Sequence, residues 1–238
     1  MNLRIVLVRP RNPLNIGSVA RAMANFGFDD FVVVSPYDPV WRETVSAVGA
    51  ESLVLKAGCA KSLDEAVGDC QLVLGTTTGK GRSLERPVVK LHELGAFLKK
   101  RGVNDRQKIA LLFGSEKTGL GNAHLEKCNA YVTIPTSSAT PSMNLSHAVA
   151  VCCYELSKKE SQTSVEKTLM ATADDRERLI KHILQLFEAA EYLKLDSETL
   201  KITKIRNSLL QWNLRMSDVR LVHGILRYMT QRMKPGPR

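Results

Sequence analysis

The stretch that decides the fold is "IPTSSATPSMNLSHAVAVCCYEL", Ile134–Leu156. It begins where the apolar run "YVTIP" ends at Pro135, passes through hydroxyl-bearing residues and a second proline, and finishes in an apolar helical pattern. In open α/β sheets, ligands bind at the carboxyl ends of strands, where such connections lie. The stretch therefore predicts a buried strand, a stiff polar loop at a binding site, and a buried helix.

Short apolar runs alternate with helical patterns before and within this stretch. Runs rich in Val, Ile and Leu predict buried strands at Leu3–Val8, Phe31–Ser35, Cys70–Thr77, Lys108–Gly114 and Tyr131–Pro135, with a weaker run at Ser52–Lys56. Helices are predicted between them at Leu14–Phe26, Ser62–Val67, His92–Arg101, Ala123–Cys128 and Asn144–Ser157. This alternation is typical of an α/β domain in which helices cover both faces of a parallel sheet. We place this domain at residues 1–158.

The rest of the chain has a different pattern. Residues 159–175 are polar and predict a linker, and residues 176–238 predict a basic, all-helical C-terminal extension. Leu179, Ile183 and Leu186 fall on one helical stripe, which needs a partner surface. From residue 200 to the end there are nine Lys and Arg residues and a single acid, Asp218.

The composition favours an anionic partner. The chain has 238 residues, a formal net charge of +10 and a sequence pI of about 9.5, and nucleic acid is the first candidate for such a surplus. The five cysteines form no C-x-x-C pair and no cluster with histidine, which predicts no metal site and a reducing compartment. No apolar run has the length of a signal peptide or a membrane span, so we expect a cytoplasmic protein.

Two glycine-containing loops do not match nucleotide-binding motifs. In "GTTTGKGRSLERP", Gly75–Pro87, the spacing is one residue short of a P-loop, and Gly81 follows Lys80. In "LLFGSEKTGLGN", Leu111–Asn122, the glycines do not match G-x-G-x-x-G. The first loop keeps a cationic character suited to phosphate. We expect RNA contacts from eight cations: Arg9, Arg11, Lys80, Arg82, Arg86, Arg206, Arg215 and Arg220.

Taken together, three segments are more specific than any one of them. The series "NPLNIGSVARAMANFG", "LLFGSEKTGL" and "IPTSSATPSMNLSHAVAV" resembles the three ordered motifs of the SPOUT-class RNA 2′-O-methyltransferases, in the TrmH/TrmJ branch. The resemblance covers about residues 1–158. The basic helical extension makes the TrmJ-like tRNA methyltransferases the nearest match.

This resemblance implies a fold, a cofactor and an assembly. The sheet would carry a C-terminal trefoil knot, and the three motif loops would meet there to hold S-adenosylmethionine. Two subunits would form a homodimer, with each active site completed by its partner. The substrate would be tRNA, at cytidine or uridine 32 of the anticodon loop.

The resemblance also assigns site residues. The catalytic set would be Asn15, Arg21, Glu116, Ser142 and Asn144. The cofactor contacts would be Thr76, Thr77, Gly114, Glu116, Gly119, Leu120, Ile134, Pro135, Ser142 and Met143. The family assigns proton acceptance to the arginine at Arg21. Because guanidinium holds its proton firmly, alignment of the ribose or its phosphate is the alternative role.

Several alternatives stay open on the sequence. Taken by itself, the segment Arg9–Gly27 favours the interpretation of Arg21 as an exposed arginine on a solvated helix face. The segment "TTTGKGR" departs from the Thr-Ser-Ala-Arg type of loop usual in the family, and Met143 stands where Leu is more common. The target could be ribosomal RNA, and the chain could be an RNA-binding relative without activity. A nucleotide- or NAD-dependent α/β enzyme is a third class, which the failed spacings disfavour.

Overall fold

The computed structural model describes residues 1–79, 86–158, 169–190, 192 and 198–233. These residues divide into two compact units, Met1–Val165 and Glu166–Arg238, which are described separately. Two of the predicted RNA contacts, Lys80 and Arg82, lie outside the described residues.

The first unit is built on a parallel sheet. Its strands, in chain order, are β1 Asn2–Val8, β2 Asp30–Val34, β3 Gly58–Ala60, β4 Leu72–Thr76, β5 Val88–Lys90, β6 Lys108–Phe113 and β7 Ala130–Thr133. Across the sheet they run in the order β3-β2-β1-β6-β4-β7-β5, and every described pairing is parallel. The predicted α/β fold with a parallel sheet is confirmed.

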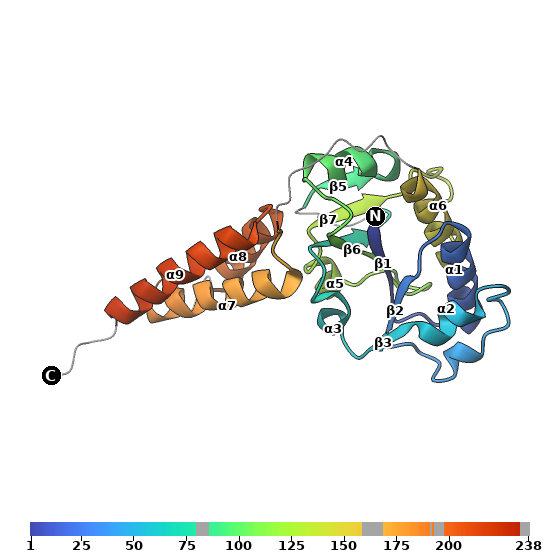
Figure 1. Ribbon diagram of the computed structural model, residues 1–238, viewed down its shortest axis with the longest axis horizontal. Coiled ribbons are helices and arrows are strands. Elements are labelled where there is room, and N and C mark those ends of the chain that lie inside the picture. Colours follow the sequence, from blue (N-terminus) through green and yellow to red (C-terminus); the bar gives the residue numbers. More distant parts are fainter. Residues whose placement is uncertain (80–85, 159–168, 191, 193–197, 234–238) are drawn as a thin grey trace. The chain divides into compact units, whose positions relative to one another are not determined.

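Helices lie on both faces of this sheet (Figure 1). Helices α1, α2 and α6 pack on one face, with α1 in contact with both of the others, and α3 and α5 lie on the opposite face. The helix bounds are α1 Pro13–Asn25, α2 Glu51–Lys56, α3 Leu63–Val67, α4 Leu94–Lys100, α5 Asn122–Leu125 and α6 Leu145–Ser157, with short 3-10 turns at Trp41–Glu43 and Leu91–Glu93.

The core lies between the sheet and the helices. Strand residues such as Ile5, Leu111 and Val132 are fully or almost fully buried, as are Ile16 and Val149 from the two long helices. The near-continuous apolar runs follow from burial on both faces of the sheet. The strands therefore end in fixed positions at the carboxyl edge, where the motif loops begin.

One predicted strand is wrong. The run at Ser52–Lys56 forms helix α2, which buries Leu53 and Val54 while Leu55 is 68% exposed. Two adjacent buried residues followed by an exposed one fit a helix face, and a short apolar run does not distinguish the two structures.

The second unit is helical in its described part. Its helices are α7 Ala173–Ala189, α8 Glu198–Gln211 and α9 Met216–Met233. Leu179 and Leu186 of α7 pack with Val219 and Leu226 of α9. Helix α7 begins three residues before the predicted boundary at 176, because Thr172 and Asp175 form a capping box. The end of the segment predicted as a linker thus belongs to this unit.

Candidate active site

The three motif loops and the loop after β4 begin at four neighbouring strands of the sheet. Strands β1, β6, β4 and β7 are adjacent, and their carboxyl ends lead into the segments that begin at Arg9, Gly114, Thr77 and Ile134. Parallel strands bring their carboxyl ends to one edge. Segments far apart in the sequence are therefore placed around one region of the first unit.

Glu116 connects two of these segments. Its carboxylate accepts the backbone N–H groups of Arg11 (2.8 Å) and Asn12 (3.1 Å) and the Nδ2 of Asn15 (2.9 Å). Burial alone would raise the pKa of Glu116, but these hydrogen bonds outweigh it and hold the pKa below its ordinary value. An ionised carboxylate with three donors braces the loops and is poorly suited to accept a proton from a substrate.

Asn144 connects the third segment to the same network. Its Oδ1 caps helix α6 by accepting from the backbone of Ser146 at 2.9 Å, and its Nδ2 donates to Oδ1 of Asn15 at 3.3 Å. Three residues of the predicted catalytic set, Asn15, Glu116 and Asn144, therefore form one hydrogen-bonded chain.

The other two members of that set lie outside this chain. Arg21 is exposed on α1, and within the described residues its side chain has no hydrogen-bond or ion-pair partner. Ser142 is also exposed and, by the same description, makes no hydrogen bond. The network thus fixes the frame of the site, and no described hydrogen bond joins the Arg21 guanidinium or the Ser142 hydroxyl to it.

Glycine is required in the loop after β6. A Cβ on Gly114 would lie 2.0 Å from the carbonyl carbon of Gly119 and 2.1 Å from the nitrogen of Leu120. Gly119 itself has φ +64° and pairs with Ser115 in an isolated bridge. The close approach expected toward a ligand is therefore, first of all, an approach of this loop to itself.

The residues predicted to contact the cofactor differ in burial and in their hydrogen bonds. Ile134 and Met143 are half-buried apolar side chains, and Pro135 is exposed. Thr76 donates its hydroxyl to the carbonyl of Leu112 at 2.8 Å, so this group already has an acceptor within the sheet. Thr77 is half-buried, and its backbone N–H donates to Val132 at 3.0 Å.

Leu120 differs from the other predicted cofactor contacts because its side chain is buried. It is 2% exposed, and a Cβ on Gly75 would lie 3.3 Å from its Cδ1, so its side chain points into the core and only its backbone faces the loop.

The residues available fit a nucleoside cofactor. Half-buried Ile134 and Met143 offer apolar walls for a base, and the polar loop between them is held by its own bonds. Thr136 donates to the carbonyl of Pro141 at 3.1 Å, and the N–H of Thr140 donates to Ser137 at 3.1 Å. Such pre-ordering lowers the entropic cost of wrapping a ligand.

Two predicted RNA contacts are corrected by the structure. Arg86 is 4% exposed and donates to the carbonyl of Leu125, so its guanidinium stabilises the interior of the first unit. Arg206 forms a two-pronged ion pair with Glu177, at 2.7 and 2.8 Å, within the helical unit. Neither guanidinium is presented to an external phosphate. Arg215 and Arg220 are exposed.

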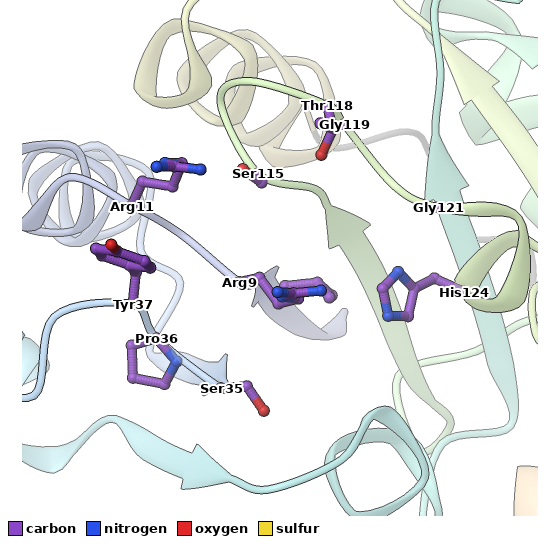
Figure 2. A pocket seen from close by; sticks show the side chains of 11 residues that line it. Arg9, Arg11, Ser35, Pro36, Tyr37, Ser115, Thr118, Gly119, Gly121 and His124 are labelled. Carbon is purple, nitrogen blue, oxygen red and sulfur yellow. The ribbon is translucent and has the colours of Figure 1, made fainter.

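The remaining two predicted contacts, Arg9 and Arg11, lie in a pocket of about 700 Å³ (Figure 2). The pocket opens at the carboxyl ends of β1, β2 and β6. It is lined by Val8, Arg9, Arg11, Ser35, Pro36, Tyr37, Ser115, Thr118, Gly119, Gly121 and His124. The sequence did not single out Ser35, Tyr37 or His124. The one available signal was an aromatic residue between two prolines directly after a predicted strand, in "SPYDP".

Two further observations concern metal ions and membranes. Across the part of the chain that the structure describes, no group of three or more His, Cys, Asp or Glu side chains is arranged to hold a metal ion. No described helix is long and apolar enough to cross a membrane.

Comparison with known proteins agrees with this geometry. Residues 2–154 match the model of the SpoU rRNA Methylase family. The tRNA (cytidine/uridine-2′-O-)-methyltransferase TrmJ of Sodalis glossinidius is 30% identical, covering 98% of this chain and 93% of that protein. TrmJ of Escherichia coli K12 is 32% identical, covering 98% and 97%. The crystal structure of TrmJ from Z. mobilis ZM4 superposes with a TM-score of 0.81 at 27% identity, over 97% of this chain and 100% of that one. With the motif loops assembled at one edge of the sheet, these matches show that the chain belongs to the SpoU methylase family of RNA methyltransferases, among its TrmJ members.

Proposed function

We propose that this protein transfers a methyl group from S-adenosylmethionine to the ribose 2′-hydroxyl of a cytidine or uridine in tRNA, at position 32 of the anticodon loop. The observation that carries the proposal is the hydrogen-bonded chain of Asn15, Glu116 and Asn144, which joins all three family motifs. Full-length similarity to enzymes named for tRNA cytidine and uridine methylation supports the substrate class.

The cofactor would lie against the loops that follow β4, β6 and β7. Ile134, Pro135 and Met143 would contact its base, and the backbone from Gly114 to Leu120 would supply polar groups, with Thr77 at the far side. When bound, S-adenosylmethionine supplies an electrophilic methyl group on a sulfonium. The chain's own contribution is to place a ribose hydroxyl in line with that methyl group, and such alignment is worth several kcal/mol of the barrier.

Arg21 is the residue that we assign to this alignment. Its guanidinium is exposed and has no partner among the described residues, so it is available to a phosphate or ribose of RNA. A guanidinium presents a planar fork of donors to phosphate oxygens and keeps its proton. The hydroxyl proton would accordingly pass to an RNA phosphate oxygen or to water, and Ser142 would donate a hydrogen bond to the same nucleotide.

We also propose the knot and the homodimer that the family resemblance implies. Strand β7 lies between β4 and β5, although the chain enters β5 directly from β4 through residues 77–87, and α6 then packs against α1. This order is compatible with a chain that threads a loop. Leu14 of α1 and Val151 and Tyr154 of α6 are 50%, 37% and 54% exposed, which supports a partner subunit on this face. We place the protein in the cytoplasm, with its tRNA substrate.

Two other functions make different predictions. A ribosomal RNA methyltransferase would modify ribosomal RNA and leave tRNA unchanged, and an RNA-binding relative without activity would bind RNA and transfer nothing. The present arrangement favours an active enzyme, because the frame residues of all three motifs are present and connected.

The proposal is tested with tRNA transcripts that differ only at nucleotide 32 and with purified ribosomal RNA, each incubated with the enzyme and methyl-labelled S-adenosylmethionine. Label should enter transcripts with C or U at that position. Equal labelling of a transcript with a purine there would contradict the position, and labelling of ribosomal RNA alone would contradict the substrate. Calorimetry with S-adenosylmethionine and with NAD tests the cofactor separately.

A further inference from the structure

The pocket between β1, β2 and β6 presents positive charge without an internal counter-charge. Arg9 and Arg11 are exposed, and neither side chain forms an ion pair with any described residue. None of the residues that line the pocket is acidic. The neighbouring carboxylate of Glu116 accepts the backbone N–H of Arg11 and leaves both guanidinium groups unpaired. A concave site with two open guanidinium groups suits a phosphodiester.

An aromatic surface stands beside these cations. Tyr37 is 73% exposed, and the Cζ of Arg11 lies 5.0 Å from the centre of its ring. The backbone N–H of Tyr37 donates to the carbonyl of Pro10 at 3.0 Å, which ties the loop after β2 to the loop after β1. Figure 2 shows Arg11 and Tyr37 next to each other at one side of the pocket. An exposed ring held in place beside an arginine is a stacking surface for an unpaired base.

The backbone at this site adopts a conformation that ordinary residues avoid. Arg9 has φ 53° and Ser35 has φ 45°, and these are the only non-glycine residues with positive φ in the described chain. They directly follow β1 and β2, and they are held by hydrogen bonds from Arg9 N to Val34 O (2.8 Å) and from Ser35 N to Ala60 O (3.0 Å). Left-handed non-glycine residues concentrate at functional sites. Here both of them line the pocket.

His124 completes the opposite wall. Burial, together with the charges of Arg9 and Lys127, lowers the pKa of His124, which favours the neutral form of the ring. Its Nδ1 is buried and has no hydrogen-bond partner in the described structure. Figure 2 shows the ring facing the side of the pocket where Arg9 lies. A neutral imidazole can donate to or accept from a ribose hydroxyl or a base edge.

We propose that this pocket binds one unpaired nucleotide of the RNA substrate, other than the nucleotide that is methylated. Arg9 and Arg11 bind its phosphate, and Tyr37 stacks on its base. The inference rests on the proposed function, since it assumes an RNA substrate, and it adds a recognition element for a single-stranded loop. A base within a duplex is stacked on its neighbours and cannot lie on Tyr37, so the pocket distinguishes loops from stems.

The test compares variants of the full-length protein for binding to an unmodified tRNA transcript. Tyr37→Ala removes the stacking surface, and loss of one stacked base corresponds to about a 5- to 150-fold rise in Kd. Tyr37→Phe keeps the ring and should bind as the wild type does. Arg9→Gly combined with Arg11→Ala removes both guanidinium groups, and glycine accepts the φ of Arg9 without strain. For this variant the dependence of log Kd on log salt should become shallower by about 0.7 for each phosphate that the protein no longer neutralises.

Arg106→Ala is the matched control. Arg106 is an exposed arginine in the connection before β6, at the opposite edge of the sheet, and its removal should leave both Kd and the salt slope unchanged. Thermal melting of each variant checks that the fold is kept. Binding of a fully base-paired RNA should be equally weak for wild type and Tyr37→Ala.

The outcomes separate this inference from the proposed function. If wild-type protein methylates tRNA and Tyr37→Ala and the double arginine variant bind the transcript as wild type does, the pocket is not an RNA subsite. The same conclusion follows if Tyr37→Phe loses as much affinity as Tyr37→Ala. If wild-type protein neither binds nor methylates tRNA, the proposed function has failed, and this inference fails with it.

Discussion

The two edges of the sheet differ in whether their cationic side chains form ion pairs. At the amino edge, Arg4 pairs with Asp30 at 2.9 Å and with Asp69 at 2.6 Å, and Lys108 pairs with Asp69 at 2.6 Å. Burial would raise the pKa of Asp69, but Lys108 and Arg4 outweigh it and lower the pKa. At the carboxyl edge, Arg9 and Arg11 are exposed and have no ion pair among the described residues.

This difference separates cations that hold the fold together from cations that are free to bind. A guanidinium paired with two carboxylates has no net charge to offer to RNA. An unpaired one at the end of a strand or on a helix face contributes a field that attracts phosphate. The helical unit repeats the contrast, since Arg206 is paired with Glu177, while Arg215 and Arg220 are exposed.

The largest effect is expected at Arg21. Arg21→Ala should lower the rate of methyl transfer about 100-fold, the cost of a misaligned reactant, while the affinity for S-adenosylmethionine stays unchanged. Arg21→Lys should not restore the rate, because an ammonium lacks the planar fork. Single-turnover assays and calorimetry measure the two quantities. A near-normal rate in either variant would make Arg21 an ordinary exposed arginine.

A smaller loss is expected at Glu116. Glu116→Ala leaves three N–H donors without their acceptor, and it should lower activity about tenfold through loss of loop alignment. It should also lower the free energy of unfolding by about 1 kcal/mol, a value reduced for the solvent exposure of the carboxylate. Glu116→Gln keeps an acceptor oxygen, so its activity and its free energy of unfolding should lie between those of the wild type and Glu116→Ala. Wild-type kinetics in Glu116→Ala would contradict a bracing role.

The difference between the exposed and the paired arginines of the helical unit predicts a several-fold change in affinity for tRNA. Arg215→Ala combined with Arg220→Ala should weaken tRNA binding several-fold and make its salt dependence shallower, because the variant neutralises fewer phosphates and releases fewer counterions. Arg206→Ala, the paired counterpart, should mainly lower thermal stability. Salt-series binding titrations and melting curves distinguish the two. The assignment would be reversed if Arg206→Ala alone changed the salt slope.

The smallest effect on function is expected at the amino edge. Asp69→Asn should leave methyl transfer unchanged and lower the free energy of unfolding at neutral pH by about 1 kcal/mol or less, as is usual for exposed ion pairs. Because the folded state lowers the pKa of Asp69 from 3.8, this stabilisation is present above about pH 4 and is lost as the pH falls through the lowered value. Denaturant unfolding at several pH values measures it. An equal stability difference at pH 2 and pH 7 would contradict the ion-pair explanation.

Much of the sheet could be predicted from the sequence, because strands buried on both faces are near-continuous apolar runs. The exceptions have physical reasons. Helix α2 was predicted as a strand because five residues with three apolar side chains satisfy both patterns. Strands β3 and β5 were not predicted because each has three residues and only one buried position, Ala60 and Val89. These two strands form because they pair with a neighbouring strand, and this pairing is not visible in a single short stretch of sequence.

The site could be predicted in its motifs but not in its contacts. Asn15, Glu116 and Asn144 follow from the motif resemblance, yet only the structure places Glu116 on the backbone of Arg11 and Asn12. Arg86 and Arg206 were predicted as phosphate contacts because charge alone does not reveal burial or an acidic partner. Tyr37 was not predicted, because its position depends on how the loops after two strands meet.

The location of the transferred methyl group tests the proposed function most directly. The protein is incubated with tRNA and S-adenosylmethionine carrying a deuterated methyl group, and the digested nucleosides are analysed by mass spectrometry. We expect deuterated 2′-O-methylcytidine or 2′-O-methyluridine, formed about 100-fold more slowly by Arg21→Ala and at the wild-type rate by Arg106→Ala. Label on a base, no label with wild-type protein, or labelling by Arg21→Ala at the wild-type rate would contradict the claim that the unpaired guanidinium of Arg21 serves ribose methylation.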